Sequence, residues 1–385
     1  MFVFLFIVLL IVLVFVLYDY LPDFLNWIGR IKIGSITDDE QWLEAVKNIN
    51  RKWMTGGTPK LVKDENKKLQ LVEKIRNINR IPPTCYWQEA ALLKAADEDD
   101  KIGAADLEER FIDLSTGEWI VNPVNIDAAM LAYEMMSNEG IDNNEIEPAM
   151  NYTAQMLKSL YEKYGSIPYN ENAADIRFVD TVGMVCPFLI RYALTYKKEE
   201  YIEIAINQIA QYRKNGFDDG LKVPFHCFNE SNKAKLGICG WGRGCAWWAI
   251  GVTDSLKELM KAEGYDREKA LLLKLVMEIS SVADDNINDD GSISRMLFTS
   301  SLADSSASSM FAYCFAWLYS LTGDSKYSEA SEKIIRYLKS VTRRNGVIDF
   351  SQGDTRGIGF YSSSYSVIPA AQGFAASAVQ ILKNN

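Results

Sequence analysis

Five short segments of this sequence place aromatic, acidic and arginine side chains soon after a glycine. Aromatic faces stack on sugar rings, while carboxylates and guanidinium groups bind hydroxyl and anionic groups. Gathered at one face of a protein, such side chains would bind carbohydrate. The glycines and the side chains that follow are Gly117 with Trp119 and Asp127, Gly165 with Tyr169, Arg177 and Asp180, Gly220 with Phe225, His226 and Glu230, Gly291 with Arg295 and Asp304, and Gly346 with Arg356 and Tyr361.

Other kinds of chemistry have few candidates in this chain. His226 is the single histidine among 385 residues, and the six cysteines form no C-x-x-C pair. No Cys/His cluster has zinc spacing, and the G-x-S-x-G segment that carries many catalytic serines is absent from the sequence. The net charge of −10 argues against nucleic acid, because phosphate groups are bound by clustered basic side chains. We therefore expect no metal, no organic cofactor and no nucleic-acid partner.

The elements that must position these side chains are predicted to be helices. From Thr37 onward, apolar residues recur at three-to-four spacing, and no segment alternates for long as a strand would. This pattern indicates an all-α protein without a large sheet. The clearest predicted helices are Asp127–Ser137, Ile146–Tyr164, Val179–Tyr196, Glu200–Arg213, Cys245–Ala262, Arg267–Ala283, Ser306–Ser320, Ser328–Val341 and Ile368–Leu382.

The five glycine segments define a repeat. They recur every 48 to 71 residues, each between two predicted helices. A repeat of about fifty residues with two helices predicts stacked helical hairpins that bury their apolar faces against one another. About six hairpins fit residues 37–385, which favours a closed (α/α)6 barrel, a six-hairpin toroid, as one catalytic domain. An open solenoid is the alternative, although solenoids keep a stricter period. In either case the glycine segments should meet at one end of the helices.

The N-terminus predicts a membrane anchor. Phe2–Tyr18 contains no charged residue, glycine or proline, which is just long enough for a transmembrane helix. It lacks the basic start and small-residue cleavage site of a removable signal peptide, and Tyr18, Tyr20 and Trp27 resemble an interfacial aromatic belt. We expect an anchor at residues 1–18, a linker at 19–36 and an extracytoplasmic catalytic domain. A cleaved signal peptide is the alternative.

Four motifs resemble those of the unsaturated glucuronyl and rhamnogalacturonyl hydrolases, glycoside hydrolase families 88 and 105. The resemblance covers roughly residues 80–380, with the motifs in the family's order and spacing. They are N-I-D at Asn125–Asp127, R-F-V-D-T-V-G-M-V-C-P-F-L at Arg177–Leu189, F-H-C-F-N-E-S at Phe225–Ser231 with W-G-R-G-C-A-W at Trp241–Trp247, and D-S-S-A-S-S-M-F-A-Y at Asp304–Tyr313.

This resemblance implies the (α/α)6 barrel and an unusual hydrolysis. The substrate is an oligosaccharide left by a polysaccharide lyase, with a 4,5-unsaturated uronic acid at its non-reducing end. Water adds across the vinyl-ether double bond, and the resulting hemiketal collapses to release the sugar. The match makes Asp180 the acid and base that act at C4 and C5, a task one carboxyl group can perform in turn. The structural alternative for Asp180 is a helix N-cap.

The same match implies roles for the other candidates. Asp127 corresponds to an aspartate that holds sugar hydroxyls, and His226 to a histidine near the double bond; a helix start and a structural histidine are the alternatives. The remaining candidates are predicted to bind substrate or border the cleft, with core packing, ion pairing or capping as alternatives: Arg177, Trp241, Arg243, Trp247, Asp304 and Ser305.

The sequence departs from the family pattern at three places. Asn229 replaces an expected acid, Cys245 replaces Asn or a small residue, and Ala132-Tyr133 stands where glycine is common. These departures concern sugar specificity more than fold. They keep two other functions open: a toroid hydrolase or lyase acting on a saturated surface polysaccharide, and a non-catalytic, membrane-anchored glycan-binding subunit.

Overall fold

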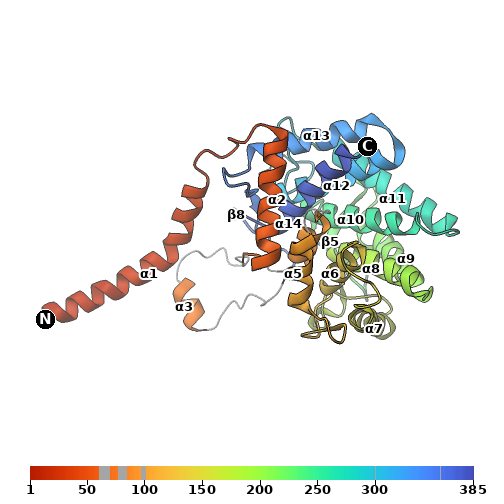
Figure 1. Ribbon diagram of the computed structural model, residues 1–385, viewed down its shortest axis with the longest axis horizontal. Coiled ribbons are helices and arrows are strands. Elements are labelled where there is room, and N and C mark those ends of the chain that lie inside the picture. The colour runs from red at the N-terminus through yellow and green to blue at the C-terminus, as the bar shows by residue number, and fades with distance from the viewer. Residues whose placement is uncertain (60–69, 77–84, 97–100, 300, 356) are drawn as a thin grey trace.

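Helices form the body of the protein, and one long helix projects from it (Figure 1). The computed structural model describes residues 1–59, 70–76, 85–96, 101–299, 301–355 and 357–385. Helices begin and end within a few residues of the predicted bounds. The clearest example is α7, Glu147–Tyr164, predicted as Ile146–Tyr164.

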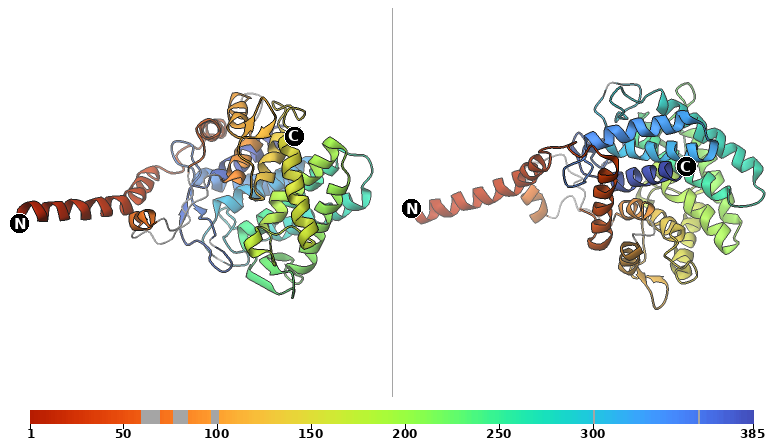
Figure 2. Two further views of the ribbon diagram at one scale, coloured as in Figure 1. Left: turned by 90° about the horizontal axis from the view of Figure 1, so that it is seen from below. Right: turned by 45° about the horizontal axis from the view of Figure 1, so that its top comes forward.

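The inner helices close into a ring. Each packs against the next along the chain, and the last packs against the first, so the described part of the chain forms a closed barrel rather than an open solenoid. Figure 2 shows the helical body and the projecting N-terminal helix from two further directions. The inner helices are α4 (Tyr86–Lys94), α6 (Ala128–Ser137), α8 (Asp180–Tyr196), α10 (Gly242–Leu259), α12 (Ser305–Thr322) and α14 (Pro369–Lys383).

Outer helices alternate with the inner helices along the chain, and several inner helices pack closely against the outer helix that follows them. Inner helices are buried all round: in α12 every residue from Ser305 to Leu318 is buried. Outer helices bury one stripe, as α13 does with Tyr327, Ile334 and Leu338, and expose the other, as expected for a surface helix. The outer helices are α2 (Asp39–Gly56), α5 (Lys101–Phe111), α7, α9 (Glu200–Asn215), α11 (Asp266–Asp284) and α13 (Ser325–Ser340).

The last glycine segment, which begins at Gly346, packs against the first outer helix, α2. Gly346 has a φ of +89°, and a Cβ atom there would lie 2.3 Å from the carbonyl oxygen of Ala45 in α2. Only glycine combines this backbone conformation with so close an approach. The turn between α13 and α14 therefore packs directly on α2, the first outer helix.

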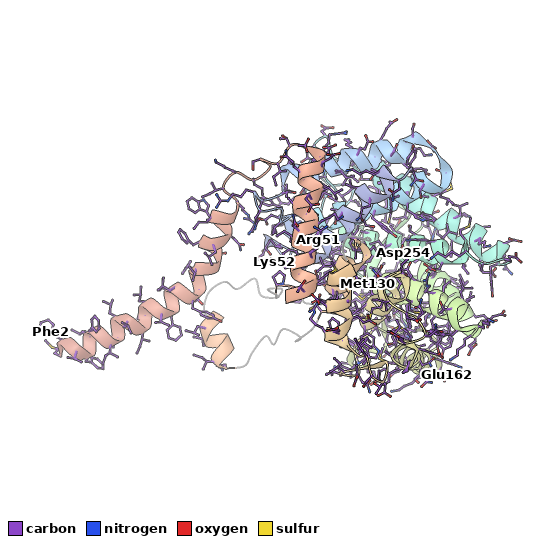
Figure 3. All side chains as sticks on the ribbon, in the orientation of Figure 1. Phe2, Arg51, Lys52, Met130, Glu162 and Asp254 are labelled. Atoms are coloured by element: carbon purple, nitrogen blue, oxygen red, sulfur yellow. The ribbon has the colours of Figure 1, made fainter. Side chains whose placement is uncertain are left out.

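Ion pairs bind the inner helices together at the opposite end from the glycine segments. The Nζ atom of Lys94 in α4 lies 2.7 Å from Glu134 in α6 and 3.0 Å from Asp254 in α10. All three side chains are buried, and Asp254 is marked in Figure 3. A buried cation with two carboxylate partners is compensated, so this cluster holds three helices in register.

Short strands form between outer and inner helices. The largest sheet pairs β5 (Val223–Asn229) antiparallel with β3 (Ile176–Phe178), β4 (Phe217–Asp218) and β6 (Lys235–Cys239). Most residues of β5 are buried, so it lacks the alternation that identifies a half-buried strand in a sequence. Two-stranded pairs join β1 (Ile112–Asp113) to β2 (Glu118–Trp119) and β7 (Ser351–Gln352) to β8 (Tyr365–Ser366). The fold is thus mostly helical, with small sheets at one face.

The N-terminal helix α1 covers Phe2–Gly29, well beyond the predicted anchor at 1–18 and through much of the predicted linker. It is long and apolar enough to cross a membrane, and a signal sequence has the same properties. Its side chains extend into the surroundings from Phe2 onward (Figure 3). A short helix, α3 (Gln70–Ile75), packs against it.

Candidate active site

A cavity of about 210 Å³ opens at the face that carries the glycine segments. Its volume lies below the roughly 300–1,000 Å³ of pockets for drug-sized ligands, so it suits a group the size of one sugar ring. It brings together five predicted site residues: Asp180, His226, Trp241, Arg243 and Trp247. The other lining residues are Trp87, Tyr169, Asn170, Phe178, Met184, Asp354, Thr355 and Gly357.

Asp180 is the first residue of α8, and its side chain is 13% exposed. Its Oδ2 atom makes no hydrogen bond within the part of the chain that the structure describes. The pKa of Asp180 is raised to about 7, mainly by burial and also by Asp354, while the residue's own backbone N–H and Arg243 oppose the shift. A carboxyl group with this pKa can both donate and accept a proton near neutral pH. The helix-cap alternative is not what the geometry shows, because no side chain caps α8.

His226, in β5, reaches the same cavity. Its Nε2 atom lies 3.6 Å from Oδ2 of Asp180, and its Nδ1 atom lies 2.9 Å from the hydroxyl of Tyr361. Burial and the nearby charge of Arg243 lower the pKa of His226 to about 4, so the imidazole is neutral at neutral pH.

Tyr361 determines which imidazole nitrogen carries the proton. Its hydroxyl oxygen accepts a hydrogen bond of 2.9 Å from the backbone N–H of Ile238. Burial raises the pKa of Tyr361, so the hydroxyl stays protonated and has one proton to donate, and Nδ1 of His226 is the acceptor if the imidazole is protonated on Nε2. In that tautomer the imidazole proton is on Nε2, the nitrogen that faces Asp180.

Trp241 and Arg243, at the start of α10, are held by the strand β7. The indole N–H of Trp241 donates to Oε1 of Gln352 at 3.0 Å. The guanidinium of Arg243 donates to the backbone carbonyl of Gln352 and, at 2.9 Å, to that of Gly353. Its donors are thus directed largely at the protein, while its charge remains beside the cavity. Trp247, one turn later, packs edge-to-face on Trp87 at 5.5 Å between ring centroids.

Asp304 and Ser305 lie behind the cavity. Asp304 caps α12 by accepting from Ser306, and it also accepts a 3.0 Å hydrogen bond from the backbone N–H of Gln352. The hydroxyl of Ser305 lies 2.7 Å from that of Ser351. Both residues therefore position β7, which in turn holds Trp241 and Arg243.

Arg177 also lies outside the cavity. Its guanidinium donates to the hydroxyl of Ser166 at 2.5 Å and to the backbone carbonyls of Tyr164 and Ala174, and it lies 3.7 Å from Glu230. Because the side chain is buried among these partners, it braces the loop before α8.

Asp127 is buried at the start of α6, without capping that helix. The pKa values of Tyr86 and Tyr169 are raised mainly by burial and also by the negative charge of Asp127. Tyr169 lines the cavity and is also influenced by Asp180. Asp127 therefore lies near Tyr169, which lines the cavity, although Asp127 is not itself a lining residue.

Several lining residues were not predicted. Asp354, Thr355 and Gly357 follow β7, beyond the extended piece that begins at Gly346, and Trp87 lies at the start of α4. Trp87 could have been found from its position at the start of an inner helix. Asp354, Thr355 and Gly357 lie on an irregular loop, where no periodic pattern singles out one residue. Arg356, predicted on the same loop, is outside the described residues. Trp119 lies elsewhere, with its indole N–H bound to the carbonyl of Ala149 at 2.9 Å.

The three departures from the family pattern do not line the cavity. The Asn229 side chain accepts from the backbone N–H groups of Ser231 and Asn232, at 3.0 and 3.1 Å, and so forms a turn. Cys245 is completely buried in α10, where burial raises its pKa. The hydroxyl of Tyr133 donates to Glu258 at 3.0 Å, in the buried polar cluster that also contains Lys94.

Comparisons with known proteins agree with this architecture. The family model described as Glycosyl Hydrolase Family 88 matches residues 113–375. No curated protein sequence matches the chain.

Solved structures with the same fold include possible members of glycoside hydrolase family 105 from Salmonella enterica serovar Paratyphi A and from Klebsiella pneumoniae. The first has a TM-score of 0.72 at 17% identity, covering 89% of this chain and 94% of that one. The second has a TM-score of 0.71 at 17% identity, covering 91% and 95%.

An unsaturated glucuronyl hydrolase from Bacillus sp. GL1, described as responsible for the degradation of glycosaminoglycan, has a TM-score of 0.63 at 17% identity. The likeness covers 88% of this chain and 95% of that one. The match of the family model over more than half of the sequence, on a toroid with a carboxyl group in its cavity, shows that the chain belongs to glycoside hydrolase family 88 and is a glycoside hydrolase.

Proposed function

We propose that this enzyme removes a 4,5-unsaturated uronic acid from the non-reducing end of lyase-generated oligosaccharides by hydrating its double bond. The observation that carries the proposal is Asp180, a carboxyl group with a pKa near 7 whose Oδ2 atom is free to act in a cavity of single-sugar size. Hydration of a vinyl ether needs a proton donor and a base at adjacent carbons, and one group of this pKa supplies both.

In the proposed reaction, protonated Asp180 gives its proton to C4. The electron pair of the C4–C5 double bond forms the new C–H bond, and positive charge develops at C5 and the ring oxygen. Water then attacks C5 and returns a proton to the Asp180 carboxylate. The resulting hemiketal opens to a ketone at C5 and leaves a hemiacetal at C1. Collapse of that hemiacetal to an aldehyde releases the linked sugar as an alcohol. One water is consumed, and Asp180 regains its starting state.

The surroundings of Asp180 support this cycle. A uronate carboxylate in the cavity adds a negative charge, which favours the protonated form of Asp180 before reaction. His226, neutral and with its proton on Nε2, acts beside Asp180 by donating to the incoming water or to the ring. Arg243 supplies fixed positive charge that attracts the uronate group.

Other candidates act in binding under this proposal. Trp241 and Trp247 offer aromatic faces to the sugar, and Asp127 holds hydroxyl groups together with Tyr169. Arg177, Asp304 and Ser305 act from behind, as positioning residues for the loop before α8 and for β7.

We also propose that α1 is an uncleaved membrane anchor and that the catalytic domain lies outside the cytoplasm. Support comes from its apolar length and from Tyr18, Tyr20 and Trp27, which lie toward its C-terminal end as interfacial aromatic residues do.

The test uses the near-ultraviolet absorbance of the unsaturated sugar. Products of several uronic acid lyases are incubated with the full chain, and loss of absorbance is followed with release of the linked sugar. We expect loss with at least one product and none with Asp180→Asn. No loss on any product, from a correctly folded protein, would rule the proposal out.

The saturated-polysaccharide alternative gains no support from the site, because Asn229 and Cys245, the residues that suggested it, lie outside the cavity. A purely binding role is disfavoured by the raised pKa of Asp180, since a carboxyl group that only binds hydroxyls works best ionised. Release of reducing ends from a saturated glycan, without a change in absorbance, would identify the first alternative.

A further inference from the structure

Large apolar side chains are exposed on the loops that surround the cavity. Val124, before α6, is 85% exposed; Leu302, before α12, is 61% exposed; and Phe360, before α14, is 70% exposed. Single exposed apolar residues are common and need no explanation, but these three lie on loops at the same end of the inner helices. We call the loops between outer and inner helices on this side the catalytic face.

Helix α1 leaves the domain at this same face. In Figures 1 and 2 it projects from the side of the ring where β8 lies. The guanidinium of Arg30, the residue after α1, binds both carboxylate oxygens of Asp349, at 2.9 and 3.0 Å, and donates to the carbonyl of Tyr365 in β8 at 2.7 Å. The end of α1 is therefore attached to the loop that contains β7 and β8.

A second arginine completes this attachment. Arg343 lies 2.7 Å from Asp349 and donates at 3.0 Å to the side chain of Asn26, within α1. Asp349 is completely buried, and hydrogen bonds from Arg30 and charge from both arginines hold its pKa below the ordinary value although burial alone would raise it. Breaking the contact with Arg30 would weaken compensation of a buried charge, so α1 is held in a defined direction. We call Asn26, Arg30, Arg343 and Asp349 the clamp.

The clamp continues directly into the site. Two residues after Asp349, β7 begins, and its Gln352 binds Trp241 while Asp354 lines the cavity. The helical residues 19–29 extend for about 16 Å, because an α-helix rises 1.5 Å per residue. Tyr20, Phe24 and Trp27 are exposed along this stretch. Aromatic side chains of this kind are typical of the lipid headgroup level.

We propose that the catalytic face docks on the lipid bilayer that holds α1, with the clamp directing the cavity toward the membrane surface. Val124, Leu302 and Phe360 then contact the lipid headgroup region. The enzyme consequently prefers saccharide chains attached to that surface over free oligosaccharides. This preference rests on the proposed hydration reaction, whereas the docking rests only on the proposed membrane anchor.

Docking is tested by crosslinking to lipid. A photoreactive phenylalanine analogue replaces either Phe360 or Met277 in the full chain, which is inserted into vesicles of phosphatidylcholine and phosphatidylglycerol. Met277 is a matched site because it is exposed, at 42%, but lies on the outer helix α11. We expect lipid adducts at position 360 and at least tenfold fewer at position 277. Equal labelling at the two positions, or none at 360, would overturn the proposal.

The clamp is tested with Asn26→Ala combined with Arg30→Ala. These changes should lower lipid adducts at position 360 several-fold, because the domain can then turn relative to α1. Arg51→Ala is the control, since Arg51 on α2 pairs with Glu44 at the surface. If the double variant fails to fold, Asn26→Ala alone replaces it, with a smaller decrease expected. Unchanged adducts in a folded clamp variant would contradict the role of the clamp.

The substrate preference is tested with one unsaturated disaccharide, offered free and coupled to a phospholipid in the same vesicles. We expect at least tenfold faster turnover of the coupled form, and loss of that advantage when the clamp is broken. Equal turnover of both forms would contradict the preference. If neither form is consumed while position 360 still crosslinks to lipid, the proposed reaction fails and the docking stands.

Discussion

The Nε2 atom of His226 lies 3.6 Å from Oδ2 of Asp180, but this contact is not an ion pair at neutral pH. Burial lowers the pKa of His226 to about 4 and raises that of Asp180 to about 7. A neutral imidazole thus faces a carboxyl group that is close to half protonated. This arrangement suits an acid that must give up a proton and then recover it from water.

Asp180→Asn should abolish turnover and stabilise the fold at alkaline pH. The folded pKa of Asp180, about 7, is above its ordinary value of 3.8, so its contribution to stability is present below pH 3.8 and is lost as the pH rises through 7. The variant should therefore exceed the wild type in free energy of unfolding by up to about 4 kcal/mol at pH 8, using 1.36 kcal/mol per pKa unit. At pH 4 the two proteins should be alike. Denaturant unfolding at both values measures this, and an equal difference at both would contradict the pKa shift.

The pH dependence of kcat/KM should be bell-shaped. Activity should fall above about pH 7 as Asp180 loses its proton, and below about pH 4 as His226 becomes charged. Asp354 raises the pKa of Asp180, so Asp354→Asn should move the alkaline limb to lower pH. Initial rates across the pH range, measured on an unsaturated substrate, test this. An alkaline limb that moves to higher pH would contradict it.

Tyr361→Phe should lower kcat about tenfold with little change in KM, because it removes the hydrogen bond that orients His226. A loss of about 1.4 kcal/mol is typical of one such bond. His226 is the only histidine, so a protein labelled with ¹⁵N-histidine shows one pair of ring nitrogens. The Nδ1 resonance should move toward that of a nitrogen without a hydrogen bond.

Tyr365→Phe is the control for this experiment, since it removes another partly buried hydroxyl, on β8, that does not contact His226. A fall in stability without a fall in kcat would show that Tyr361 has only a structural role.

Gln352→Ala should weaken substrate binding and destabilise the domain by roughly 1–3 kcal/mol, the usual consequence of leaving a buried donor unsatisfied. The variant removes the acceptor of the Trp241 indole N–H, and with it a donor to the carbonyl of Ser362 at 2.9 Å. Gln211→Ala is the control, because Gln211 makes an exposed hydrogen bond to the carbonyl of Gly165. Thermal unfolding and KM together measure the effect, and a KM equal to that of the control would argue against a bracing role.

Gly346→Ala should destabilise the ring more than Gly323→Ala does. Both glycines have a positive φ, of 89° and 67°, so alanine costs roughly 1–2 kcal/mol at either. At Gly346 the new Cβ also meets the carbonyl oxygen of Ala45 at 2.3 Å, whereas nothing lies within 4 Å at Gly323. The difference in free energy of unfolding therefore isolates the close packing that closes the ring. Equal losses of unfolding free energy in the two variants would show that the contact with Ala45 relaxes easily.

The sequence determined the helices and their repeat, because apolar spacing reflects which face of each helix is buried. It also identified Asp180, His226, Trp241, Arg243 and Trp247 through motifs. It did not reveal β5, whose buried residues do not alternate, or Asp354, which lies on a loop without a periodic pattern. Spacing alone did not distinguish a closed ring from an open solenoid.

Only the tertiary structure decided which candidates face the cavity. Three candidates have the residue types of a binding site, but they form hydrogen bonds with backbone groups and neighbouring hydroxyls instead: Arg177, Asp304 and Ser305. Asp180 acquired its pKa from burial beside Asp354, a neighbour far away in the sequence. A sequence records which groups a chain carries; their charge and reach depend on solvent exclusion and on neighbours that the closed ring brings together.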